Sequence, residues 1–194
     1  WKPSRERIQQ ANITRFITLV NERFGLKIET YADLQKWSVA HIPEFWSLMW
    51  EFGEVRASVP YESAVTDLQD MLDVRWFPGA RLNFAENLLR YRDERTALVF
   101  KGEGRAPRRI TYAELFNKVS QLAKALASAG VGVGDRVAGF LPNMIETVIA
   151  MLAATSLGAV WSSCSPDFGT KGILDRFQQI APKVLLTANA YVYN

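Results

Sequence analysis

The sequence has little cysteine and little histidine, with one residue of each among 194. The single cysteine, Cys164, excludes an internal disulfide and stands inside an apolar run, so we interpret it as a buried, inert thiol in a reducing compartment. The single histidine, His41, has no Asp, Cys or second His at the spacing of a metal site. We therefore predict neither a disulfide framework nor metal ligands in this sequence.

The sequence also lacks an uninterrupted apolar run of membrane-spanning length. Its most apolar stretch, residues 144–164, is broken by polar residues and by Gly158, and no charged-then-apolar leader opens the chain. The 23 basic and 20 acidic residues give a net charge of +3 and are scattered rather than clustered, which is not the footprint of a nucleic-acid-binding protein. We therefore expect a soluble, cytoplasmic protein without membrane or nucleic-acid partners.

The common phosphate-binding motifs are missing or stand in the wrong context. Asp167-Phe168-Gly169 spells the magnesium-binding tripeptide of protein kinases, but no glycine-rich loop and no His-Arg-Asp loop precede it. The pattern G-x-x-x-x-G-K-[ST] does not occur, because residues 169–172 contain its ingredients in a different order. The glycines of residues 130–134 follow a predicted helix and precede a strand, the reverse of a dinucleotide loop, and they indicate a turn.

Residues 1–92 differ in composition from the rest and hold five of the six tryptophans. The apolar spacing predicts helices over residues 8–24, from 31 onward, over 44–52 and over 80–89. Aromatic residues on short helices are typical of packing against a larger body, and a partner-binding surface is the alternative. We interpret 1–92 as an aromatic-rich, mainly helical N-terminal segment, with a domain boundary near Asp93.

Residues 93–194 have the pattern of an α/β domain. Two β-prone runs, 97–100 and 109–111, predict a hairpin, and Thr111 with Glu114 forms a capping box for a helix that ends before Gly130. Strands are then expected at 136–141, 159–164 and 183–188, alternating with helices at 144–157 and 170–181. This alternation predicts a partial parallel sheet with helices on both faces.

The sequence also indicates where two helices in this domain begin. Asn143 and Glu146 have the spacing of a capping box for the helix that we begin at Met144. The turn of residues 165–170 follows the second parallel strand, at the edge of the sheet where ligands bind in open α/β folds. This turn is the functional candidate that the residues themselves suggest, and a purely structural turn is the open alternative.

Several segments together resemble a known family. Residues 135–143 and 150–160 resemble the first α/β segment of the adenylate-forming acyl-CoA synthetases. The stretch from Trp76 to Leu89, WFPGARLNFAENLL, resembles the N-terminal region of the acetyl-CoA synthetase group, and residues 159–177 are most similar to the acetoacetyl-CoA synthetases within that group. The resemblance spans essentially the whole chain and implies that it is the N-terminal part of such an enzyme.

The resemblance implies an ATP-dependent, AMP-forming ligase with two steps. Acetoacetate and ATP give an acyl-adenylate and pyrophosphate, and coenzyme A then displaces AMP to form acetoacetyl-CoA. In this family the phosphate loop, the adenine and ribose contacts and the lysine of the C-terminal domain all follow the segment that residues 1–194 resemble. We therefore expect no catalytic residue in this chain, and we expect the ATP and Mg²⁺ sites beyond it.

The resemblance also implies wall residues of a coenzyme A channel. In acetyl-CoA synthetases the turn that matches 165–169 is glycine-rich and borders this channel, and an arginine after the third strand meets a CoA phosphate. In this sequence Asp167 stands where a glycine is usual, and Tyr193 stands where the arginine falls. We take Ser165, Asp167, Gly169 and Tyr193 as candidate CoA-binding residues. Asp167 could equally cap the helix that follows, whose amino end favours a carboxylate.

Two alternatives to this function remain open at the level of sequence. The first is another short-chain acyl-CoA synthetase, acting on acetate or propionate. The second is an α/β binding module without chemistry of its own. A continuation of the parent chain into a Thr/Ser-Gly-rich loop that ends in Pro-Lys would favour the enzyme, because that loop holds the phosphates of ATP in the family.

Overall fold

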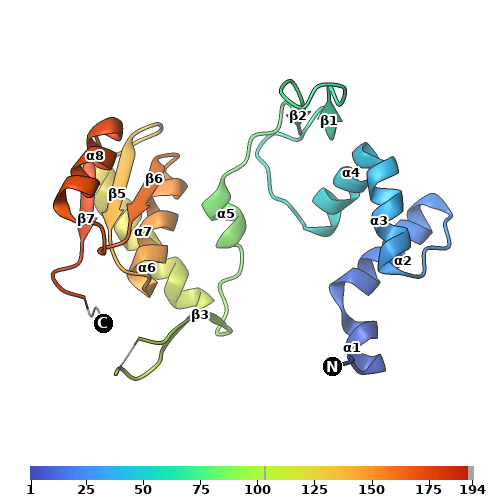
Figure 1. Cartoon of the computed structure of the whole chain (residues 1–194), viewed down its shortest axis with the longest axis horizontal. Helices are drawn as coiled ribbons and strands as arrows, with labels where there is room; N and C mark the ends of the chain where they lie inside the picture. The colour runs from blue at the N-terminus through green and yellow to red at the C-terminus, as the bar shows by residue number, and fades with distance from the viewer. Residues whose placement is uncertain (103, 192–194) are drawn as a thin grey trace. The chain divides into compact units, whose positions relative to one another are not determined.

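The structure is a computed structural model that describes residues 1–102 and 104–191 (Figure 1). Contacts divide the chain into two compact units, Trp1–Leu82 and Asn83–Asn194. The domain boundary near Asp93 that we infer from composition stays a prediction. No helix within the described ranges is long and apolar enough to cross a membrane.

The first unit starts with four helices. They are α1 (Arg5–Gln10), α2 (Asn12–Phe24), α3 (Tyr31–Ala40) and α4 (Ile42–Phe52). The single helix predicted over 8–24 is interrupted at Ala11, whose extended backbone ends α1 and begins α2. Thr30 caps α3 by accepting a hydrogen bond from the backbone N–H of Asp33. The order of these short helices along the chain is therefore as the sequence predicts, with one additional break at Ala11.

Aromatic side chains hold this unit together. The ring of Phe16 meets Phe45 and Phe52 edge to face, at centroid distances of 5.6 and 5.2 Å. Val20 and Trp37 are buried in the same cluster. Edge-to-face pairs of this kind add to the stabilisation from burial alone. These contacts all lie within the helical unit, so packing of the aromatic segment against a larger body stays a prediction.

The end of the first unit and the start of the second differ from the prediction. Two short strands, β1 (Val65–Thr66) and β2 (Arg75–Trp76), pair antiparallel. The helix predicted over 80–89 is only α5 (Phe84–Leu88), capped by Asn83. The prediction is too long because Arg81 exchanges backbone hydrogen bonds with Val59, which keeps that part of the chain extended.

After α5, the second unit continues with the predicted hairpin and helix. β3 (Thr96–Phe100) pairs antiparallel with β4 (Arg108–Thr111). α6 (Tyr112–Ser128) then starts with the complete capping box of Thr111 and Glu114. Both features follow from local sequence, because a hairpin and a cap involve residues close together in the chain.

A three-stranded parallel sheet forms the centre of this unit. Its elements are β5 (Arg136–Phe140), α7 (Ile145–Ser156), β6 (Val160–Cys164), α8 (Thr170–Ile180) and β7 (Val184–Thr187). The strand order is β6-β5-β7, so the first strand in sequence lies in the middle. The predicted fold class, a partial parallel sheet preceded by a helical segment, is confirmed.

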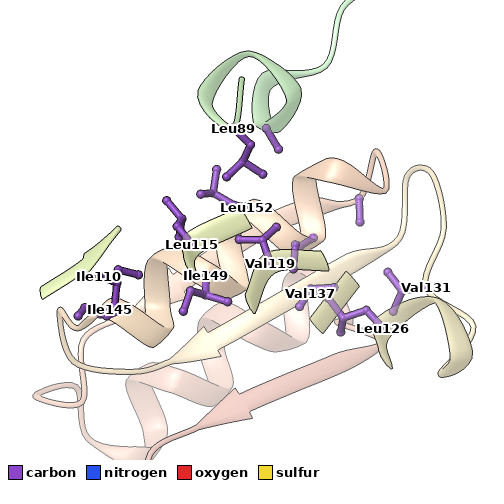
Figure 2. Close-up of a cluster of buried hydrophobic side chains, with 14 residues drawn as sticks. Leu89, Ile110, Leu115, Val119, Leu126, Val131, Val137, Ile145, Ile149 and Leu152 are labelled. Atoms are coloured by element: carbon purple, nitrogen blue, oxygen red, sulfur yellow. The ribbon is translucent and has the colours of Figure 1, made fainter. Parts of the chain in front are cut away.

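Alternate residues of β5 face opposite sides of the sheet. Val137 is fully buried in the main core with Val119 of α6 and Leu152 of α7 (Figure 2). Its neighbour Ala138 packs in a second cluster with Phe177 of α8. Because successive side chains of a strand point to opposite faces, α7 and α8 cover the two faces of the same sheet.

The start of α7 differs from the prediction. The N-cap is Met144, with no side-chain cap hydrogen bond, so the predicted capping box of Asn143 and Glu146 does not form. Glu146 instead accepts a hydrogen bond from Arg108 of β4 at 2.6 Å. A charge-assisted hydrogen bond is stronger than a neutral one, and here it joins the carboxylate to β4.

Candidate ligand-binding edge of the parallel sheet

The strand order places a topological switch point at the carboxyl edge of the sheet. From central β5 the chain crosses by way of α7 to β6 on one side, and then by way of α8 to β7 on the other side. Ligands in open parallel sheets bind where the connections diverge in this way. The loops at this edge are residues 141–144, 165–169 and 188–191.

The turn after β6 is held by its own side chains. Ser165 Oγ donates a hydrogen bond to Asp167 Oδ2 at 2.7 Å, and the Phe168 N–H donates to the Ser165 carbonyl at 3.2 Å. Pro166 is buried, whereas Ser165 and Asp167 are exposed. The structure therefore brings two of the predicted site residues into direct contact and leaves both accessible to a ligand.

Asp167 makes no cap hydrogen bond to α8, although the sequence allows that role. The N-cap of α8 is Gly169, and no side chain makes a cap hydrogen bond there. A methyl group added at Gly169 would meet no atom within 4 Å, so nothing in the described residues requires glycine for space. The Arg176 guanidinium of α8 lies 4.1 Å from the centre of the Phe168 ring, which joins this turn to the helix.

The loop after β7 reaches back to the turn after β6. Tyr191 Oη donates a hydrogen bond to the Pro166 carbonyl oxygen at 3.0 Å. β6 and β7 are not neighbours in the sheet, since β5 lies between them, so this bond spans the end of β5. Tyr193, the fourth predicted site residue, lies outside the described residues.

A cavity of about 180 Å³ opens at the same edge, next to the hairpin. Its lining comes from the β3–β4 hairpin, the loop after β5 and the loop after β7. The lining residues are Phe100, Gly102, Arg105, Arg108, Pro142, Met144, Ala190 and Tyr191. Arg105 and Arg108 supply its cationic groups, and the carboxylate of Glu146 pairs with Arg108.

This ion pair changes the ionisation of both partners. The hydrogen bond from Arg108 holds the pKa of Glu146 below its usual value, against an opposing effect of burial. The same bond raises the pKa of Arg108. Glu146 Oε1 receives this bond, whereas Oε2 is buried without a hydrogen-bond partner in the part of the chain that the structure describes. Both groups therefore stay charged at neutral pH.

Sequence reasoning did not find this cavity. Its arginines stand in a loose hairpin loop, more than 80 residues before Tyr191, and no motif connects the two segments. The sequence does contain a weaker signal. Arg105 lies in the predicted connection between β3 and β4, and Arg108 begins β4. The position of this hairpin at the edge of the sheet could have been used to predict that both lie near the end of β5.

Comparison with protein families identifies the class. Residues 84–193 match the AMP-binding enzyme family, and residues 31–88 match the acetyl-coenzyme A synthetase N-terminus. The chain belongs to the AMP-binding enzyme family, which agrees with the parallel sheet and its open carboxyl edge. Over its whole length it is similar to acetoacetyl-CoA synthetases, as the sequence motifs predict.

Three relatives define the similarity. Acetoacetyl-coenzyme A synthetase from Rhizobium meliloti is 48% identical over 194 residues, covering all of this chain and 30% of that protein. The structure of acetoacetyl-CoA synthetase from Streptomyces lividans matches with a TM-score of 0.90 and 45% identity, over all of this chain and 30% of that one. A malonamoyl-CoA synthetase from Penicillium aethiopicum is 39% identical, over 92% of this chain and 26% of that protein. The chain thus spans about 30% of the length of the first two relatives.

Proposed function

We propose that this chain is the N-terminal part of a cytoplasmic, ATP-dependent, AMP-forming ligase that converts acetoacetate to acetoacetyl-CoA. The observation that carries the proposal is the 48% identity over the whole chain to an acetoacetyl-coenzyme A synthetase, supported by the TM-score of 0.90 to a second one. Family membership alone supports only the coarser statement that the full-length protein activates an acid with ATP.

The proposed reaction has two balanced steps. A carboxylate oxygen of acetoacetate bonds to the α-phosphorus of ATP as pyrophosphate leaves, which gives the acyl-adenylate. The thiol of coenzyme A then bonds to the acyl carbon, the carbon–oxygen bond to AMP breaks, and the thiol proton is lost to a base. Charge accumulates on phosphoryl oxygens in these steps, so stabilisation is mainly electrostatic.

Mg²⁺ and ATP belong to the remainder of the full-length protein in this proposal. Among the described residues no group of three or more His, Cys, Asp or Glu side chains lies close enough together to hold a metal ion. We assign no step of the reaction to a metal held by these residues.

In this proposal the turn of residues 165–169 forms part of the wall of the coenzyme A channel. The exposed Ser165 and Asp167 lie at the carboxyl edge of β6, next to the loop after β7. Gly169 adds no side chain at this point and leaves room for a ligand. Tyr193 remains a candidate from the sequence alone.

The test uses full-length protein and two separate assays. Acetoacetate-dependent exchange of pyrophosphate into ATP reports the first step, and thioester formation reports both steps. Activity with acetoacetate well above that with acetate, propionate or malonamate is the expected result. A preference for one of the other acids would replace acetoacetate as the substrate, and no exchange with any acid would favour a binding module without chemistry. The 194-residue chain alone is expected to match a blank without enzyme.

A further inference from the structure

The cavity beside the β3–β4 hairpin combines positive charge with apolar walls. Arg105 and Arg108 line one side, and Phe100, Met144 and Pro142 contribute apolar surface. It lies at the carboxyl edge of the sheet, which is the ligand-binding edge of this architecture. Its volume of about 180 Å³ is below the range of whole small-molecule sites, so it suits one terminal group of a larger ligand.

The net charge of the lining comes from Arg105. The charge of Arg108 is offset by its 2.6 Å hydrogen bond to Glu146. Arg105 makes no ion pair with a carboxylate within residues 1–102 and 104–191, and its backbone N–H closes a turn to the Gly102 carbonyl. A guanidinium in this position can donate two hydrogen bonds to one phosphoryl group, a geometry that Arg provides and Lys does not.

A helix terminus adds to the positive electrostatic potential in the cavity. Met144, which lines the cavity, is the N-cap of α7, and no side chain caps the first turn of that helix. The partial positive charge of a helix amino end favours an anion nearby. The negative charge of Glu146 offsets part of this positive potential, and Arg108 in turn offsets the charge of Glu146.

We propose that this cavity is a phosphoryl-binding subsite, in which Arg105 binds the ligand directly and Arg108 is held in place by Glu146. The inference deepens the proposed function and rests on it for the identity of the ligand, because coenzyme A and ATP both carry phosphoryl groups. The apolar walls strengthen the interaction, since they lower the local dielectric constant around the charges.

Arg105→Gln in the full-length protein is the primary test, and Arg109→Gln is the matched control. Arg109 has the same charge, stands on the same hairpin and is exposed, but it does not line the cavity. Binding of adenosine 3′,5′-bisphosphate and of ATP is measured by calorimetry, and KM is measured for coenzyme A and for ATP. Losing a charge-assisted hydrogen bond should weaken the interaction about tenfold.

The two ligands distinguish the source of the phosphoryl group. Weaker binding of the bisphosphate and a raised KM for coenzyme A in Arg105→Gln, with the ATP values unchanged, assign the subsite to coenzyme A. The opposite pattern assigns it to ATP. Unchanged affinity for both probes, or an equal loss in Arg109→Gln, overturns the proposal.

A second variant tests the cavity without changing Arg105. Ala190→Glu places a carboxylate in the lining and should weaken the same ligand, whereas normal affinity in this variant counts against the site. The calorimetric measurement needs no turnover. It therefore still tests the subsite if the protein proves inactive with acetoacetate, so the failure of the proposed function and the failure of this inference can be told apart.

Discussion

Tyr191 Oη donates a hydrogen bond to the carbonyl oxygen of Pro166 at 3.0 Å. The bond joins the loop after β7 to the turn after β6 across the end of the strand between them. Both candidate binding features lie along this connection: the turn with Ser165 and Asp167 on one side, and the arginine-lined cavity, to which Tyr191 itself contributes, on the other.

Replacing Tyr191 with Phe should loosen this edge of the sheet. The variant keeps the ring and removes the hydrogen bond, so we expect a loss of about 0.5–1.5 kcal/mol in the free energy of unfolding. Amide hydrogen exchange should become faster in the turn of residues 165–169 while β5 stays protected. Tyr31→Phe, at an exposed tyrosine of the first unit, is the control. Unchanged exchange in the turn would show that the bond does not restrain it.

Replacing Leu152 with Ala should destabilise the second unit strongly. Leu152 is 2% exposed at the centre of the cluster in Figure 2, so truncation leaves a cavity and should cost about 2–5 kcal/mol. Lys124→Ala, on the exposed side of α6, should cost less than about 0.5 kcal/mol. Urea unfolding followed by circular dichroism measures both, and equal midpoints would contradict the burial of Leu152.

Replacing Asp167 with Asn separates a binding role from a structural one. Asn keeps an oxygen that can accept the hydrogen bond from Ser165, but it removes a negative charge. If Asp167 borders the coenzyme A channel, the loss of repulsion should lower the KM for coenzyme A, and pyrophosphate exchange should stay unchanged because it needs no coenzyme A. A lower melting temperature with the same KM would mean that the turn is only structural.

The ion pair of Arg108 and Glu146 should make stability depend on pH on the acid side. Its hydrogen bond lowers the pKa of Glu146 in the folded state. A carboxylate with a depressed folded pKa stabilises the protein above the unfolded pKa, and this contribution is lost as the pH falls through the folded pKa. Both side chains are about half exposed, so the effect is at most about 1 kcal/mol.

The variant Glu146→Gln tests this dependence. It should be less stable than the parent at pH 7, and the difference should shrink steadily as the pH is lowered below the usual carboxylate range. Glu94→Gln, at an exposed glutamate outside this pair, serves as the control. A difference between parent and Glu146→Gln that stays constant down to acid pH would exclude the ion pair as its cause.

Much of the fold follows from local sequence. The capping box of Thr111 and Glu114 marks the start of α6, and the apolar runs of residues 136–141 and 159–164 become β5 and β6 with small changes at their ends. These features depend on neighbours in the chain, so periodicity and capping chemistry suffice to find them. The motifs that indicate the family are equally contiguous, which is why the family could be recognised from the residues.

Other features were decided only by packing between distant segments. The side chain of Glu146 turns to Arg108 instead of capping α7, because an ion pair with another strand competes with the local hydrogen bond. Gly139 is another case: a methyl group there would lie 2.6 Å from the Trp161 ring, a constraint that β5 alone does not reveal.

The site shows the same division between sequence and structure. The sequence determined that Ser165 and Asp167 follow a strand and so lie at the ligand-binding edge of the sheet. It could not determine that β5 would be central, or that Arg105 and Ala190 would line one cavity. Strand order and cavities depend on contacts between residues far apart in the chain, and such contacts form only when the helices bury their apolar faces against the sheet.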